Sequence, residues 1–192
     1  MKGFKQVITA SKYLKELGYD FQVLIGGDGE QKQQLNNLIV EFQLEKYVKL
    51  IGRVEDKHNF FNKLDCFIFS SNKEDIGMVV PEAISYQVPM VANRIAFVSD
   101  LLTENEYLMA EADDLKNVEN IWKAKPTDKI WWQVKTNYRF ETELLNPQLL
   151  CDKMAFAIDN YLIMQQKAKN AYDKIKEYSM EKLVKKFVEM IK

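Results

Sequence analysis

The sequence predicts an α/β fold in which helices flank a Rossmann-like parallel sheet, with a helical extension at the C-terminus. Four short apolar runs, at residues 21–25, 48–52, 66–71 and 88–93, have the length and composition of buried strands. The segments between the earlier runs carry apolar residues at helical spacing. Helices of about 8 to 15 residues between buried strands are typical of parallel βαβ units.

The first half of the chain supplies these elements in alternation. The first helix starts at Phe4 and is closed by Gly18. After the strand at 21–25 comes a glycine-rich loop at 26–29. The apolar face of a second helix then consists of Leu35, Leu38, Ile39 and Phe42. The strand at 48–52 follows this helix.

The alternation continues through the middle of the chain. A short helix is predicted at 56–63, before the strand at 66–71. Another helix is predicted to begin at about Met78, and Pro89 introduces the strand at 88–93. Parallel sheets bind ligands outside the carboxyl ends of their strands. The loops after these strands are therefore the candidate binding loops, at 26–29, 52–55, 70–77 and 93–100.

We expect three regions along the chain. Residues 1–112 form the α/β domain, 113–147 a Trp-rich helical insertion, and 148–192 C-terminal helices that pack on the same domain. Periodicity in the insertion is weak, so we interpret its tryptophans as anchors of amphipathic helices. Ser179 is the expected N-cap of the last helix.

Composition excludes several classes of function. The net charge of -1 provides no basic excess for a nucleic-acid backbone. No apolar run reaches the roughly 18 to 20 residues that span a bilayer. We therefore expect a cytoplasmic protein with at most peripheral contact at the inner face of the membrane.

The two cysteines, Cys66 and Cys151, lie in unlike sequence contexts and are expected to be reduced.

The main candidate site is the glutamate pair Glu74 and Glu82. The spacing itself is uninformative, because two other glutamate pairs in the chain share it. What distinguishes this pair is its surroundings. It follows a strand, spans Gly77, enters a helix and is followed by another strand.

A helix that begins just after Gly77 directs its first N–H groups toward the loop. These groups lack partners within the helix and carry the positive end of its dipole, so they suit a diphosphate. Gly77 allows a ligand close to the backbone, and Pro81 is tolerated in the first helical turn. Glu74 and Glu82 flank this anion site, and each carboxylate can accept two hydrogen bonds from a vicinal diol. A nucleotide sugar carries such diols on both sides of its diphosphate.

Residues 71–83, Ser-Asn-Lys-Glu-Asp-Ile-Gly-Met-Val-Val-Pro-Glu-Ala, resemble the Glu-x7-Glu motif of family-4 (group 1) glycosyltransferases with the GT-B fold. Other segments resemble that family in the same order. They are the Lys2-Gly3 pair, the strand and loop at 23–30, the strand and turn at 48–54, and the Tyr-Ser-Met element at 178–180. The resemblance covers about residues 2–110 and 150–192. It implies the C-terminal, donor-binding half of a retaining enzyme.

The resemblance also implies roles for individual residues. Glu74 would hold hydroxyls of the donor sugar, and Lys2 would neutralise the departing diphosphate, so these two are the catalytic candidates. Glu82 would hold the ribose diol. The remaining donor-binding candidates are Gly27, Arg53, Val54, Gly77, Met78 and Val79. Arg53 and Val54 would lie near the base.

The family needs neither metal nor cofactor, because cationic side chains and helix amides neutralise the diphosphate. We see no set of metal ligands in the sequence, and the single histidine, His58, is expected at the surface. The implied substrate is a nucleoside diphosphate sugar, with a UDP-sugar favoured.

The sequence departs from the family in two ways. Near the donor site it has Ala96-Phe97 for a Gly-Gly pair, Asp100 for a glutamate, and Gln87 where glycine is common. These changes are expected to narrow the donor site or to alter which sugar fits. In addition, the family places a strand before the Lys-Gly pair, at the centre of the sheet, whereas this sequence begins at the pair. We expect a sheet without its middle strand, with unpaired edges on both neighbours.

Three functions remain open on this evidence. The first is the donor-binding half of a retaining glycosyltransferase that acts on a glycan or lipid-linked acceptor. The second is a fragment or split-gene subunit that binds the nucleotide sugar, docks to a separate N-terminal acceptor domain or subunit, and is inactive alone. The third is a sugar-nucleotide epimerase, which matches the combined motifs less well.

Overall fold

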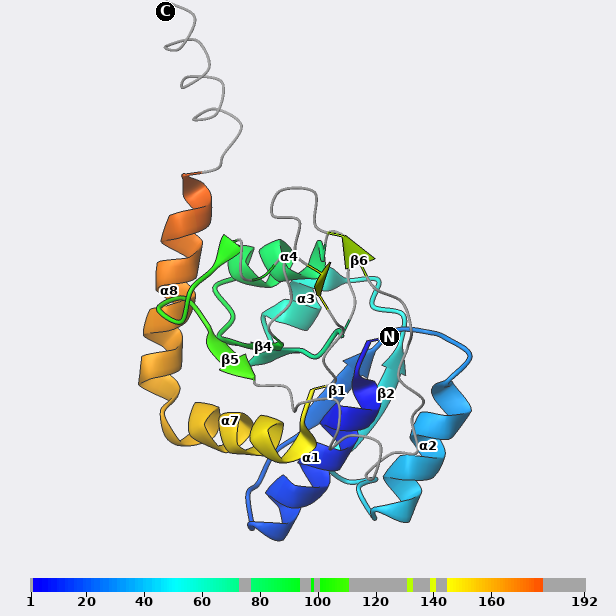
Figure 1. Cartoon of the computed structure of the whole chain (residues 1–192). Coiled ribbons are helices and arrows are strands. Elements are labelled where there is room, and N and C mark those ends of the chain that lie inside the picture. The colour runs from blue at the N-terminus through cyan, green and yellow to red at the C-terminus, as the bar shows by residue number, and fades with distance from the viewer. Residues whose placement is uncertain are drawn as a thin grey trace, which may run out of the picture.

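The computed structural model describes residues 2–72, 77–93, 98, 101–110, 131–132, 139–140 and 145–177. It confirms the predicted α/β class (Figure 1). Parallel strands and helices alternate from α1 (Phe4–Glu16) to β5 (Leu108–Ala110), and the long helices α7 (Pro147–Asp159) and α8 (Tyr161–Lys176) complete the described chain.

The parallel strands form two separate sheets. In one, β1 (Val23–Gly26) pairs with β2 (Val48–Gly52). In the other, β4 (Met90–Asn93) lies between β3 (Phe67–Phe69) and β5. No strand within the described ranges joins β1 to β3. The two parallel sheets therefore stay separate in the described ranges.

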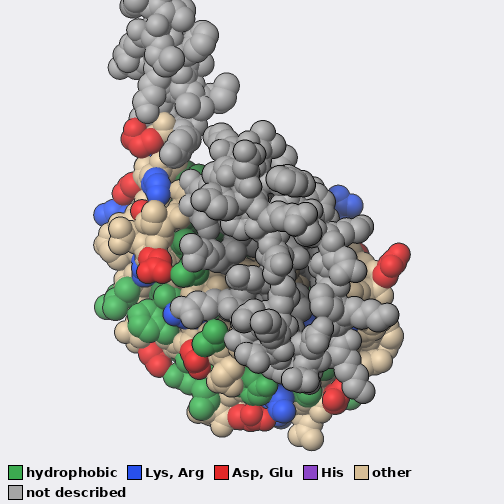
Figure 2. All heavy atoms as spheres, in the orientation of Figure 1, with side chains coloured by type: hydrophobic (Ala, Val, Ile, Leu, Met, Phe, Trp, Pro, Cys, Tyr) green, Lys and Arg blue, Asp and Glu red, His purple; other side chains and the backbone are tan. Residues whose placement is uncertain are grey.

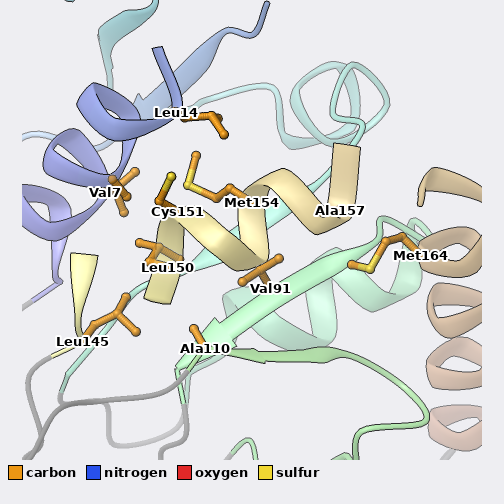
Figure 3. Close-up of a cluster of buried hydrophobic side chains, with 11 residues drawn as sticks. Val7, Leu14, Val91, Ala110, Leu145, Leu150, Cys151, Met154, Ala157 and Met164 are labelled. Carbon is orange, nitrogen blue, oxygen red and sulfur yellow. The ribbon is translucent and has the colours of Figure 1, made fainter. Parts of the chain in front are cut away.

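Side chains of the larger sheet alternate between two cores, as the two-residue period of a strand requires. One set faces α1 and α7, where Leu14 and Cys151 pack close to Met154 (Figure 3). The other set faces α4 (Val79–Ser85) and α8. The first set comprises Ile68, Val91, Leu108 and Ala110, and the second comprises Phe67, Phe69, Met90, Ala92 and Met109.

The smaller sheet has its own core on the same face as α1. Ile25 of β1 and Val48 of β2 pack against Ile8 of α1 and against α2 (Lys32–Glu41). The helix contributes Leu35 and Ile39, two of the residues on its predicted apolar face. Helix α1 therefore packs against both sheets.

Two helix starts have clear local causes. α3 (Lys57–Phe61) begins after Asp56, whose carboxylate accepts a hydrogen bond of 2.9 Å from the Asn59 N–H. α7 begins after Asn146, whose side-chain oxygen accepts from the N–H groups of Gln148 at 2.7 Å and Leu149 at 3.1 Å. Pro147 occupies the first turn of α7, where its missing N–H costs nothing.

The Trp-rich stretch differs from the prediction where it is described. β6 (Trp131–Trp132) and β7 (Arg139–Phe140) form an antiparallel pair, so these four residues are strand and not helix. Aromatic residues favour strands, which is a sufficient physical reason. Trp122 and the predicted N-cap Ser179 lie outside the described residues, and the three predicted region boundaries remain predictions.

Candidate active site

A cavity of about 380 Å³ opens at the carboxyl ends of β1 and β3 and continues between these two strands. Four separate segments bring predicted site residues to its wall: the start of the chain, the loops after β1 and β2, and α4. These residues are Lys2, Gly27, Arg53, Val54, Val79 and Glu82. Loops that are distant in sequence thus meet at one edge, as parallel strands require.

Two other predicted residues, Gly77 and Met78, do not line this cavity. Gly77 is buried with a φ of 57°, a left-handed conformation that favours glycine. Met78 is the N-cap residue of α4 and is 61% exposed. Glu74 lies in the segment 73–76, outside the described residues.

Lys2 is held at the end of β3 by its own backbone. The Ser70 hydroxyl donates a hydrogen bond of 2.8 Å to the Lys2 carbonyl. The next residue, Gly3, packs so closely that a Cβ atom would lie 1.9 Å from the Ser70 carbonyl oxygen. Packing therefore requires glycine at position 3, and the Lys2 side chain is exposed at the cavity.

The first turn of α4 forms directly after Gly77. The Val80 N–H donates to the Gly77 carbonyl at 2.8 Å, and the Glu82 N–H donates to the Met78 carbonyl at 3.2 Å. Pro81 lies in this turn, as predicted. The helix thus begins where the sequence placed it, and Glu82 lies one turn inside it.

Glu82 is engaged by a residue that the sequence reasoning missed. The Lys57 ammonium lies 2.7 Å from Glu82 Oε1, and both side chains line the cavity. Lys57 is 57% exposed and Glu82 31%, so the pair contributes at most about 1 kcal/mol to folding stability. The available signal was the Asp56 N-cap, which places Lys57 in the first turn of α3 at the carboxyl edge.

A buried polar network anchors the loop that carries Glu74. The Asn93 side-chain amide donates to the Ser71 carbonyl at 3.2 Å and to Asn72 Oδ1 at 3.3 Å. Asn72 Oδ1 also accepts from the Leu145 N–H at 3.2 Å. These bonds join the ends of β3 and β4 to the segment before α7. Sequence reasoning also missed this network, because its members are far apart along the chain.

The described residues contain no group of three or more His, Cys, Asp or Glu side chains placed to hold a metal ion. In the same part of the chain, no helix is long and apolar enough to cross a membrane.

Cys66 and Cys151 are both free thiols. Burial raises the pKa of Cys66 to about 12 and that of Cys151 to about 11, so neither is an activated nucleophile.

Comparison with known proteins now gives the family. The family model for glycosyl transferases group 1 matches residues 1–125, well over half of the chain. The chain belongs to this family. The predicted group 1 membership is therefore confirmed, and the cavity described above lies within the matched residues.

Curated relatives of this group 1 chain are longer proteins. An uncharacterized glycosyltransferase of Methanocaldococcus jannaschii is 25% identical over 195 residues, which cover 97% of this chain and 45% of the relative. The capsular polysaccharide biosynthesis glycosyltransferase CapM of Staphylococcus aureus is 26% identical over 119 residues, covering 61% of this chain and 31% of CapM. The chain thus spans less than half the length of these relatives.

Solved structures share the fold of this group 1 chain. HepE of Anabaena, determined with UDP and glucose, superposes with a TM-score of 0.68 at 18% identity, over 99% of this chain and 44% of HepE. The C-terminal domain of a group 1 family protein (LpcC) from Francisella tularensis gives 0.67 at 18% identity, over 93% of this chain and 80% of that domain. The fold is that of a GT-B C-terminal domain.

Proposed function

We propose that the chain is the donor-binding half of a retaining glycosyltransferase. Its reaction would transfer a sugar from a nucleoside diphosphate sugar to a glycan or lipid-linked acceptor, in the cytoplasm or at the inner face of the membrane. The observation that carries the proposal is the cavity at the carboxyl edge. Its wall contains cationic side chains, a carboxylate and exposed loop backbone from four segments.

The charges around the cavity suit the two parts of such a donor. Lys2 and Arg53 are exposed cations at its wall, and a diphosphate needs positive charge as it becomes the leaving group. The amides of Gly77, Met78 and Val79 stand at the start of α4, where the helix dipole favours an anion. Glu82 supplies the acceptor oxygens for a ribose diol, and Glu74 has the same role for the sugar.

A UDP-sugar is the favoured donor. HepE was determined with UDP and with UDP-glucose, and its fold covers nearly the whole of this chain. In this proposal Arg53 and Val54 contact the uracil, beyond Gly27. No metal takes part, because Lys2 and the helix amides neutralise the diphosphate.

The second candidate is a nucleotide-sugar-binding module that is inactive alone. The matched residues span 45% of the Methanocaldococcus jannaschii relative and 31% of CapM. In this case a separate acceptor domain or subunit completes the enzyme. The two candidates share the donor site and differ in whether the isolated chain transfers sugar to an acceptor.

Titration calorimetry with UDP tests the donor site itself. Glu82→Ala should weaken UDP binding by about 1 to 3 kcal/mol, because it removes a hydrogen bond to a charged group. The matched control is Glu41→Ala, at an exposed glutamate in α2 that does not line the cavity. Equal affinities for the wild type and both variants would refute the ribose assignment.

A further inference from the structure

The contact between Lys57 and Glu82 is one of two that join the facing sides of α3 and α4. Phe61 lies four residues after Lys57, and Tyr86 lies four residues after Glu82, so each helix presents both of its members on one face. The rings of Phe61 and Tyr86 stack with their centroids 5.2 Å apart and an interplanar angle of 18°. The two helices therefore meet at a polar contact beside the cavity and at an aromatic contact one turn further on.

The aromatic contact helps to fix the polar one. Phe61 is 2% exposed and shares a buried cluster with Ala83 of α4. At the other end of α3, the Asp56 carboxylate caps the helix. Both ends of this short helix are thus held in place. Lys57, in its first turn, consequently stands opposite Glu82 in a defined position.

Both members of the polar contact are open to a ligand. The Lys57 side chain is 57% exposed and that of Glu82 is 31% exposed, and both line the cavity. Among the described residues of the cavity wall, Glu82 is the only carboxylate. The cavity thus offers a ligand an ammonium and a carboxylate side by side.

An ammonium beside a carboxylate gives a vicinal diol two different partners. A lysine ammonium has three donors and no acceptor, a carboxylate has only acceptors, and a hydroxyl can both donate and accept. Lys57 uses one donor on Oε1 of Glu82, at 2.7 Å. One hydroxyl of the diol can therefore donate to Oε2, while the oxygen of the other accepts from a second N–H of the ammonium. A lone carboxylate would offer the second hydroxyl no donor.

We propose that Lys57 is a second ribose-binding residue, and that the Lys57–Glu82 pair makes the site selective for ribonucleotides over deoxyribonucleotides. The inference rests on the proposed function, which assigns the ribose diol to Glu82. It adds a direct hydrogen bond from Lys57 to one hydroxyl, and it specifies the donor as a ribonucleoside diphosphate sugar. Hydrogen bonds to charged groups are the stronger ones, so a deoxynucleotide that lacks one of the two hydroxyls loses a substantial contact.

Titration calorimetry on the full chain tests this contact with UDP, 2′-deoxy-UDP and 3′-deoxy-UDP. The wild type should bind UDP about tenfold more tightly than either deoxy ligand, because each lacks one hydrogen bond to a charged group. In Lys57→Met, the preference for UDP over one of the two deoxy ligands should fall below about threefold, since that ligand lacks the hydroxyl that Lys57 contacts. A loss of orientation at Glu82 alone would weaken all three ligands alike and leave both preferences unchanged.

Lys12→Met is the matched control for this substitution. It removes the lysine of another exposed ion pair, with Glu16 of α1 at 3.7 Å, and Lys12 does not line the cavity. Its affinities for all three ligands should equal those of the wild type.

The possible outcomes separate this inference from the proposed function. A wild type that does not bind UDP would overturn the donor site, and the inference with it. If the wild type binds UDP but Lys57→Met keeps the full preference over both deoxy ligands, the donor site stands and the direct contact from Lys57 is overturned. Equal binding of all three ligands by the wild type would overturn the selectivity for ribonucleotides.

Discussion

At the residue scale, the central arrangement is the contact between Lys57 and Glu82 at the wall of the cavity. The Lys57 ammonium donates a hydrogen bond of 2.7 Å to Oε1 of the Glu82 carboxylate. This bond orients the carboxylate and leaves its other oxygen, Oε2, for a ligand. Sequence reasoning placed Glu82 correctly because the helix start around Gly77 is a local signal. It could not find Lys57, since the pairing depends on how α3 packs beside α4.

Replacing Lys57 by methionine tests whether this contact serves binding. We expect Lys57→Met to weaken UDP binding by about 1 kcal/mol, because Glu82 loses the partner that orients it. Thermal stability should change little, since an exposed ion pair contributes at most about 1 kcal/mol. Calorimetry and a thermal melt on the same protein measure both effects. A large fall in Tm with unchanged affinity would make the pair structural.

Glu74 is predicted to contact the sugar and not the nucleotide. Glu74→Ala should therefore weaken binding of UDP-glucose by about 1 to 3 kcal/mol and leave UDP affinity unchanged. Calorimetry with both ligands on the same variant measures this difference, and the UDP titration serves as the control for the UDP-glucose titration. Equal losses for both would remove the sugar-binding role.

At the scale of elements, the strands and helices from α1 to β5, together with α7, follow closely from local pattern. Asp56 and Asn146 cap α3 and α7, and two-residue alternation divides β3 and β4 between two cores. The network around Asn72 and the β6–β7 pair were not foreseen. The first depends on contacts between distant segments, and the second on a two-residue strand too short to show periodicity.

Helix α8 is attached to the loop before β5 through Glu106. Its carboxylate accepts from the Thr103 N–H and hydroxyl, both at 2.6 Å, and pairs with Lys174 of α8 at 3.3 Å. Burial acts to raise the pKa of Glu106, but these hydrogen bonds and Lys174 outweigh it and hold the pKa below its ordinary value. The carboxylate thus stabilises the folded state in its charged form.

This attachment should weaken in acid. Because the pKa of Glu106 is lower in the folded state, its stabilisation is complete above the unfolded pKa of about 4.3 and is lost as pH falls through the folded pKa. Glu106→Gln should lower the free energy of unfolding by about 1 to 2 kcal/mol at pH 7. In thermal melts from pH 7 to pH 3, Tm of this variant should fall less steeply in acid than Tm of the wild type. The exposed neighbour provides the control, Glu104→Gln, which should behave as wild type. If Tm of Glu106→Gln fell as steeply in acid as Tm of the wild type, the assignment would be contradicted.

At the scale of the whole molecule, α1 packs against both parallel sheets, and α7 and α8 complete the described fold. In the described ranges, no strand lies between β1 and β3. Hydrophobic side chains also gather where α7 meets α8, including Leu162 at 80% exposure (Figure 2).

A crystal structure of the chain with UDP tests the central claim most directly. We predict the diphosphate between Lys2 and the start of α4, the ribose at Glu82, and the uracil beside Arg53 and Val54. UDP bound elsewhere, or a ribose out of hydrogen-bonding reach of Glu82, would contradict the account.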